Sequence, residues 1–335
     1  MFEQVIVPLD GSRMAQCALP AAVSIATTYN SEIELLHVLS ESQSDVSTQV
    51  DPLQWHMRKA ESESYLSTIA HTLAQHDLTT RRTILEGAAA ERIVAHAAAQ
   101  DVDLLVMSSH GHTGISGWNV SSVAQKIIAR ANRSILLVRA FQQPPTTRQE
   151  IEPLNFRRLL VPLDGSRRAE CILPVANKLA TAFGATVWLV HVATPANLVS
   201  PFAPRGEEAP SPDDVAQQYT HAADAYLQHL QAQLDCASKT AVLQGDTILS
   251  TLNHFAARET VDLMLICAHG QANTRQPYGS FVTSAIIHGD VSLFILQDLL
   301  PTEIEPTRAE IAASQLTNGN PIRTNQHAQP AFWTH

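Results

Sequence analysis

The sequence predicts an α/β protein made of two tandem domains, each with a five-stranded parallel sheet. The chain has 335 residues, about twice the roughly 150 residues of an ordinary domain. The hexapeptide VPLDGS occurs at residues 7–12 and returns 154 residues later, at residues 161–166. In each copy, short apolar runs rich in β-branched residues alternate with longer segments of helical periodicity.

The expected strands follow one another in the same order in both copies. Those of the first copy are VIVP, EIELLHV, TTRRTIL, LLVMS and SILLV, and those of the second are LLVP, TVWLVHV, KTAVL, LMLIC and SLFIL. Their mostly apolar character indicates burial on both faces, as in a parallel sheet covered by helices. The connections between parallel strands usually contain a helix, and the Ala-rich segment ERIVAHAAAQ, which begins at Glu91, is one of them.

The repeat continues beyond the hexapeptide. The sequence CALP at residues 17–20 matches CILP at residues 171–174, again 154 residues later. The His-Gly pair at residues 110–111 matches the one at residues 269–270, which is 159 residues later. The second copy therefore contains five extra residues between these points.

These matches place the domain boundaries. We predict a first domain at residues 1–140 and a second domain at residues 156–298. The linker between them, residues 141–155, is rich in Pro and polar residues. The C-terminal tail, residues 299–335, loses periodicity and is expected to be flexible.

Composition and charge exclude several classes of partner. The net charge of −10 argues against nucleic acid, which binds clustered Lys and Arg. No apolar run approaches the roughly 20 residues of a membrane span, and no signal sequence is recognisable at the N-terminus. We therefore expect a cytoplasmic protein with no membrane partner. The four cysteines form no C-x-x-C pair, so nothing indicates a zinc site or a disulfide framework.

The repeated turn marks a candidate binding position. In open parallel α/β sheets, ligands bind outside the carboxyl ends of the strands. Asp10 and Asp164 directly follow the first strand of each copy. A carboxylate there can accept a hydrogen bond from a sugar hydroxyl or help to hold a cation. An Asp before a helix can equally be its N-cap, and the sequence leaves both interpretations open.

A second candidate is the glycine-rich segment that follows the fourth strand of the first copy, residues 107–128. Its glycines would let backbone amides approach a phosphate, and the helix that begins near Ser121 adds free N–H groups. His110 and His112 form an H-x-H pair, but no carboxylate or cysteine stands beside them to complete a metal site.

Taken together, these features resemble the universal stress protein family. The resemblance rests on apolar-Pro-x-Asp-Gly-Ser at the first strand, LLHV at the second, and the pattern G-x2-G-x9-G-[ST] after the fourth. It covers about residues 2–139 and 156–297. It implies the adenine nucleotide alpha hydrolase-like, Rossmann-like fold with strand order 3-2-1-4-5. It also implies binding of ATP or another adenine nucleotide, together with Mg²⁺ where the nucleotide carries it.

The resemblance further implies how the two domains are arranged and where the nucleoside lies. The domains would pair within one chain as single-domain relatives pair in homodimers, and a further homodimer is left open. Asp10 and Asp164 would lie at the nucleoside, and the backbone groups of Val38 and Val192 would face the adenine.

The phosphate-loop positions differ between the copies. In the first copy the motif falls on Ser108, Gly111, Ser121 and Ser122, so that two of its three glycines are serines. In the second copy it falls on Cys267, Gly270, Gly279 and Ser280, with a spacer that is one residue shorter. Arg275, within that spacer, would compensate by pairing with a phosphate.

The sequence thus predicts an adenine-nucleotide-binding module that acts in a stress response. One alternative is a degenerate member that binds no nucleotide and acts as a protein-interaction module. Another is an adenylating enzyme of the same fold. A phosphorelay receiver would need paired carboxylates after the first strand and a Lys after the last, which this chain lacks. No pairing of nucleophile and base predicts catalysis beyond slow ATP hydrolysis, and no catalytic or metal-ligating residue is assigned.

Overall fold

The computed structural model describes residues 1–40, 52–111, 120–140, 151–195, 212–271, 276–300 and 303. The elements of the first domain are β1 (Gln4–Leu9), α1 (Arg13–Gln16), α2 (Leu19–Tyr29), β2 (Glu32–Leu39), α3 (Pro52–Ala74), β3 (Thr80–Glu86), α4 (Ala89–Ala99), β4 (Leu104–Ser108), α5 (Ser122–Ala131) and β5 (Ser134–Val138). Those of the second domain are β6 (Arg158–Pro162), α6 (Arg167–Glu170), α7 (Leu173–Phe183), β7 (Thr186–Ala193), α9 (Pro212–Gln231), β8 (Ser238–Gln244), α10 (Ile248–Arg258), β9 (Leu263–Cys267), α11 (Ser280–His288) and β10 (Ser292–Leu296).

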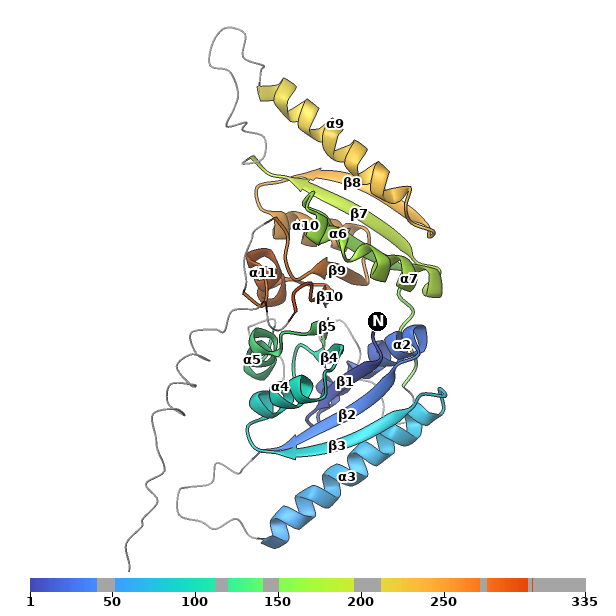
Figure 1. Ribbon diagram of the computed structural model, residues 1–335, viewed down its shortest axis with the longest axis vertical. Coiled ribbons are helices and arrows are strands. Elements are labelled where there is room, and N and C mark those ends of the chain that lie inside the picture. The colour runs from blue at the N-terminus through green and yellow to red at the C-terminus, as the bar shows by residue number, and fades with distance from the viewer. Residues whose placement is uncertain are drawn as a thin grey trace, which may run out of the picture.

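The ten strands form one continuous sheet in the order β3-β2-β1-β4-β5-β10-β9-β6-β7-β8 (Figure 1). Within each domain all neighbouring strands are parallel and follow the order 3-2-1-4-5. The predicted fold class is therefore confirmed. Helices α3 and α9, which follow the second strand of each domain, lie at opposite ends of the molecule.

The two domains join through the antiparallel pairing of β5 with β10. Leu136 pairs with Phe294, and these two residues occupy the same position in the two copies. Ile135 pairs with Ile295 and Leu137 with Leu293, so the pairing is symmetric about that central pair. A local two-fold axis thus passes between Leu136 and Phe294, and each domain covers the strand edge that the other would leave exposed.

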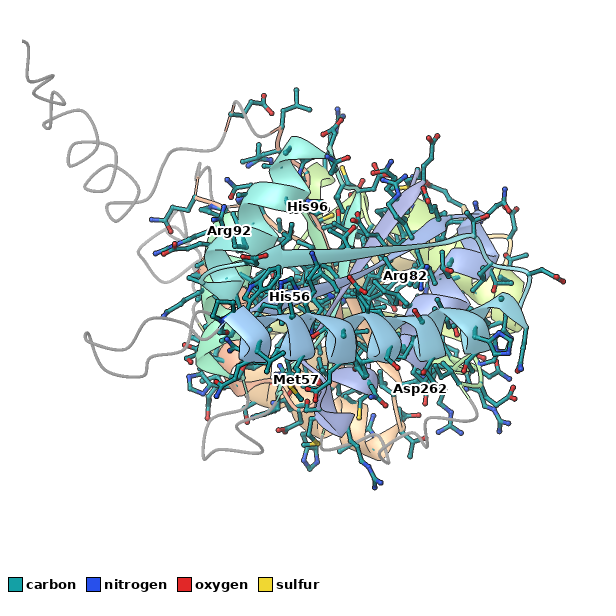
Figure 2. The ribbon with its side chains drawn as sticks, turned by 90° about the horizontal axis from the view of Figure 1, so that it is seen from below. His56, Met57, Arg82, Arg92, His96 and Asp262 are labelled. Atoms are coloured by element: carbon teal, nitrogen blue, oxygen red, sulfur yellow. The ribbon has the colours of Figure 1, made fainter. Side chains whose placement is uncertain are left out.

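Successive strand residues point to opposite faces of the sheet, and helices cover both faces. Val5 and Val7 belong to one buried cluster, together with side chains from α2, α3, α7 and α9. Ile6 belongs to the other cluster, together with side chains from α4, α5, α10 and α11. Figure 2 shows this division at the β3 edge, where α3 with His56 and Met57 lies on one side and α4 with Arg92 and His96 on the other. Each cluster extends through both domains.

Part of the predicted linker packs against the first domain. Ile151 is buried and its carbonyl lies 2.8 Å from Nε2 of His76, and the Ser24 hydroxyl of α2 donates a hydrogen bond to the Leu154 carbonyl over 2.7 Å. The rest of the predicted linker, residues 141–150, lies outside the described residues, as does the predicted tail apart from residues 299, 300 and 303. Among the described residues, no helix combines the length and the apolar character needed to span a bilayer.

Candidate functional site

The Asp-Gly-Ser turns at the ends of β1 and β6 have the same geometry. Gly11 and Gly165 both have φ of +84°, in the left-handed region that favours glycine. The first turn is closed by the backbone N–H of Ser12, which donates to Oδ1 of Asp10 over 2.9 Å. In the second turn the N–H of Ser166 donates to Oδ1 of Asp164 over the same distance.

The serines, and not the aspartates, are the N-caps of the helices that follow. The Ser12 side chain accepts a hydrogen bond from the N–H of Ala15, and the Ser166 side chain accepts one from Ala169, both over 3.1 Å. The interpretation of the aspartates as N-caps is therefore wrong, because a second good capping residue stands two positions later and takes that role. The carboxylates stabilise the turn and lie at the carboxyl end of the sheet.

A glycine from the loop after the fourth strand lies against each of these carboxylates. A β-carbon at Gly111 would stand 2.2 Å from Oδ2 of Asp10, and one at Gly270 would stand 2.1 Å from Oδ2 of Asp164. Both contacts are shorter than any side chain permits. The motif glycine in each copy thus lets the loop backbone approach the strand-tip carboxylate closely.

In the second domain, Gln271 adds to this contact. Its backbone N–H donates to Oδ2 of Asp164 over 2.8 Å, and its side-chain amide donates to the Asp164 carbonyl over 2.5 Å. Sequence reasoning missed Gln271, because a single Gln after His-Gly carries no motif. Together with Ser166, it fixes the direction of the Asp164 carboxylate.

A cavity of about 250 Å³ lies beside Asp164, over the carboxyl ends of β6, β7 and β9. We call it the second-domain cavity. The predicted site residues that line it are Asp164, Val192, Gly270, Gly279 and Ser280, and Cys267 of the same motif lines it too. Arg275 lies outside the described residues. Predicted positions from three separate parts of the sequence, at residues 164, 192 and 270–280, thus lie around one space.

The backbone of Val192 is directed toward this space. The Val190 carbonyl accepts a hydrogen bond from the N–H of Leu163, so it faces β6, whereas the Ala193 carbonyl accepts one from Gly245 and faces away from β6. Backbone groups alternate along a strand, so the N–H and C=O of Val192 point to the β6 side. β6 ends at Pro162, which pairs with Val190. Val192 therefore presents a donor and an acceptor where no strand residue stands opposite.

The N-terminus of α11 forms another wall of the cavity. Its N-cap, Gly279, has no side chain, and its backbone N–H donates to the Ala268 carbonyl over 2.8 Å. The next three N–H groups, at residues 280–282, have no partner within the helix, because an α-helix leaves its first amides unpaired. They form the positive end of the helix dipole, which favours an anion.

The corresponding helix of the first domain begins differently. Ser121 is the N-cap of α5, and its hydroxyl accepts a hydrogen bond from the N–H of Ala124 over 3.3 Å. One amide that an anion could use is thereby occupied. Ser108 is buried and its hydroxyl accepts the N–H of His110, while Ser122 is exposed. Residues 112–119 of this loop, with His112, lie outside the described residues.

A first-domain cavity of about 440 Å³ lies elsewhere. It adjoins Gly11 and His37, and its other lining residues among those described belong to α3. None of the predicted first-domain positions, which are Asp10, Val38, Ser108, Gly111, Ser121 and Ser122, lines it. The described second-domain positions thus line one cavity, whereas the first-domain positions do not line the first-domain cavity.

Histidines support the strand ends beside both turns. Nδ1 of His37 lies 2.8 Å from the Leu9 carbonyl, and Nδ1 of His191 lies 2.8 Å from the Leu163 carbonyl. Because a carbonyl only accepts hydrogen bonds, each ring carries its proton on Nδ1. The other nitrogen of His191 lies 2.8 Å from the Tyr219 hydroxyl. His191 lines the second-domain cavity with a fixed orientation.

Two further titratable groups near the cavity are Cys267 and His269. Burial raises the pKa of the Cys267 thiol far above its usual range, so this side chain is a neutral part of the cavity wall. Nδ1 of His269 lies 2.6 Å from the Asp298 carboxylate and its Nε2 lies 2.6 Å from the Gln276 carbonyl. No three His, Cys, Asp or Glu side chains gather as a metal ion would require, as far as the described residues extend.

Comparison with protein families gives a match that covers both domains. A family model described as the universal stress protein family matches residues 1–139 and 155–296. The two matched segments coincide with the two halves of the ten-stranded sheet. The duplication visible in the sequence is therefore a duplication of one family domain.

Individual relatives agree with this match. A universal stress protein of Methanocaldococcus jannaschii is 27% identical over 146 residues, which are 42% of this chain and 83% of the relative. The universal stress protein YxiE of Bacillus subtilis is 28% identical over 149 residues, which are 42% of this chain and 100% of the relative. Each of these relatives has the length of one domain.

Solved structures share the two-domain fold. A universal stress protein from Archaeoglobus fulgidus superposes with a TM-score of 0.60 at 14% identity, over 88% of this chain and 98% of that one. A putative universal stress protein from Pseudomonas aeruginosa has a TM-score of 0.63 at 13% identity, over 93% of this chain and 98% of that one. At such low identity these likenesses concern the fold alone.

Proposed function

The chain belongs to the universal stress protein family, and from this premise we propose that its second domain binds ATP or another adenine nucleotide in a stress response. One observation carries the proposal. The second-domain cavity brings a fixed carboxylate, a strand backbone beyond the end of its neighbour and an uncapped helix N-terminus to one edge of the sheet. These three groups are complementary to a ribose, an adenine edge and a phosphate.

Each part of the nucleotide has a partner in this proposal. Asp164 accepts a hydrogen bond from a ribose hydroxyl, since its carboxylate retains acceptor capacity beyond Ser166 and Gln271. The backbone of Val192 meets the adenine edge. The base packs against apolar side chains of the wall, such as Ile248 and Ile266. Ser280 and the first amides of α11 hold the phosphates.

A more open cavity of about 540 Å³ adjoins the first and shares Ile248, Ser280 and Phe281 with it. It leaves room for phosphates beyond the nucleoside. Asp246 lines it, and a carboxylate in this position can share Mg²⁺ with phosphate oxygens. Mg²⁺ would neutralise phosphate charge there.

We also propose that the two domains of one chain take the places of two subunits. The antiparallel pairing of β5 with β10 supports this, because it uses one strand edge from each domain symmetrically. A mass of 36.5 kDa in sedimentation equilibrium, that of a single chain, would show that the pairing needs no second chain, and a larger mass would indicate the further homodimer that the resemblance leaves open.

The binding proposal is tested by isothermal titration of the nucleotide-stripped, full-length protein with Mg-ATP and with Mg-AMP. We expect one site per chain. Asp164→Asn removes the charge but keeps the shape, and should weaken binding about 10- to 100-fold, as is typical when a hydrogen bond to a charged group is lost. The matched variant Asp10→Asn should bind as the wild type does. Absence of heat at protein concentrations of tens of micromolar would contradict the proposal and favour the protein-interaction alternative.

A further inference from the structure

Helix α11, which begins at the second-domain cavity, is held at both ends by the first domain. At its start, the hydroxyl of Tyr278 donates a hydrogen bond to the Arg133 carbonyl over 2.9 Å. Tyr278 directly precedes the N-cap Gly279, and it is buried. At the other end, one guanidinium nitrogen of Arg139 donates to the carbonyls of Ala285 and Ile286, over 2.8 and 3.0 Å. Arg133 and Arg139 flank β5 of the first domain.

The hydrogen bonds from the Arg139 guanidinium to the last turn of α11 orient this helix. The last carbonyls of an α-helix lack partners within it and carry the negative end of the dipole, which favours a cation. Arg139 is fully buried, and its Nε also donates to the Val291 carbonyl over 3.3 Å. Burial lowers the pKa of Arg139 to about 10, with Asp290 opposing the change, so the guanidinium stays charged at neutral pH. A buried cation in this position is costly to move away from its acceptors.

The backbone around the domain junction is symmetric. Arg139 is the first residue after β5, and Gln297 is the first after β10. The N–H of Arg139 donates to the Ser292 hydroxyl and the N–H of Gln297 donates to the Ser134 hydroxyl, both over 3.1 Å. The two positions are therefore true counterparts.

The side chains at the junction are not symmetric. The amide of Gln297 donates to the Pro277 carbonyl and accepts from the N–H of Leu299, and neither partner belongs to the first domain. The counterpart of Tyr278 is Val120, which directly precedes the N-cap of α5 and has no hydroxyl. At these two pairs of positions, the side-chain hydrogen bonds across the junction, made by Arg139 of the first domain and Tyr278 of the second, both hold α11.

We propose that the first domain is a rigid support for the second-domain site, and that Arg139 and Tyr278 are the positioning residues of that site. The contacts of these two residues across the junction fix the axis of α11, and so the direction of the amides that face the phosphates. This inference rests on the proposed nucleotide binding. Neither residue is among the described residues that line the cavity, so both act on a ligand only through α11. The first domain, whose own phosphate loop has serine at two of the three glycine positions of the motif, would thereby contribute to binding in the second domain.

The test compares full-length wild type with Tyr278→Phe, Arg139→Met and the control Ser24→Ala. Ser24→Ala removes a buried hydroxyl that bonds to the linker carbonyl of Leu154, at a distance from α11. Two quantities are measured: Mg-ATP affinity by titration calorimetry, and hydrogen exchange, without ligand, of the α11 amides at residues 283–286, which are hydrogen-bonded within the helix.

We expect Tyr278→Phe to weaken binding about tenfold, because a helix that samples other orientations is competent for only part of the time. Exchange at residues 283–286 should be faster in the same variant. Arg139→Met should show both effects more strongly. Ser24→Ala should lower thermal stability and leave both quantities unchanged.

The outcomes separate the two proposals. A wild type that binds no nucleotide overturns the proposed function, and with it the effect on affinity. A wild type that binds, with Tyr278→Phe equal to it in affinity and in exchange, overturns the positioning role alone. If Arg139→Met does not fold, Tyr278→Phe decides the question, because it removes one oxygen and keeps the buried ring.

Discussion

Gly270 lies so close to Asp164 that a β-carbon at residue 270 would stand 2.1 Å from the carboxylate oxygen Oδ2. In Gly270→Ala the carboxylate must therefore turn away, and the hydrogen bond that it accepts from the Gln271 backbone is lost. We expect Mg-ATP affinity to fall about 10- to 100-fold in a calorimetric titration, as for other hydrogen bonds to a charged group.

The duplicated domain supplies the control for this variant. Gly111→Ala brings a β-carbon within 2.2 Å of Asp10 Oδ2, so the steric change is the same in the first domain. If the second-domain cavity is the binding site, Gly111→Ala binds as the wild type does. Equal losses in the two variants would instead indicate two equivalent sites.

Ser121 and Gly279 are counterparts as N-caps, and exchanging them should separate stability from binding. Ser121→Gly should cost only a few tenths of a kcal/mol in the free energy of unfolding, and Ser121→Ala about 1 kcal/mol. In Gly279→Ser the new hydroxyl can accept the N–H of Val282, as Ser121 accepts that of Ala124. The β-carbon fits, since its nearest neighbour, the Ala268 carbonyl, is 3.4 Å away.

Gly279→Ser should therefore unfold at slightly higher denaturant concentration and bind Mg-ATP about tenfold more weakly, because the hydroxyl competes with the phosphate for an amide. Both quantities can be measured on one preparation. A variant that gains affinity would show that the hydroxyl donates to the phosphate instead.

Local features of the fold could be predicted from the sequence, whereas features that depend on distant residues could not. The strands were predictable because each is a short apolar run, and the two carboxylates were predictable because the hexapeptide repeats. The choice between Asp10 and Ser12 as N-cap was not, since both are good capping residues and only the backbone shows that Ser12 takes the role. The strand order came from the family resemblance, because no single strand encodes its neighbours.

The least predictable contacts join residues that are far apart in the chain. Tyr278 and Arg133 are separated by 145 residues, and Arg139 and Ala285 by 146. A buried Arg at the end of an apolar strand has no local signature, and sequence reasoning placed no function there. Gln271 was not predicted for another reason. The contact between Gln271 and Asp164 depends on the geometry of a turn, which the residue type does not reveal.

Phe294 lies at the centre of the domain junction and should couple the unfolding of the two domains. It is fully buried, pairs with Leu136, and its ring lies 5.5 Å from that of Phe2 of the first domain in an edge-to-face arrangement. Phe294→Ala should lower the free energy of unfolding by about 3–5 kcal/mol. Hydrogen exchange in β1 and β4 of the first domain should accelerate in the same variant.

The control is Phe255→Ala, which removes a ring of the same size from α10, where it packs against Trp188 of the second domain. We expect a similar loss of stability with little change of exchange in β1 and β4. The same exchange pattern in the two variants would mean that the whole chain unfolds as one unit. The junction would then couple the two domains no more than other parts of the core do.

His269 should make stability depend on pH, because both of its ring nitrogens face acceptors. Burial by itself lowers the pKa of His269, but the hydrogen bonds to Asp298 and to the Gln276 carbonyl, with the charge of Asp298, outweigh burial and the nearby Arg168. The pKa therefore lies above the ordinary value of 6.5. A pKa raised by folding adds stability that is complete below 6.5 and is lost as the pH rises through the folded-state pKa.

The measurement is denaturant unfolding of wild type and His269→Gln at a series of pH values from about 5 to about 9. The stability advantage of the wild type should be largest at the acidic end and shrink as the pH rises. In Asp298→Asn the decline should be smaller and end at lower pH, because the charge that favours the imidazolium is gone. A difference between wild type and His269→Gln that stays constant across this range would show that the ring does not change its protonation state there.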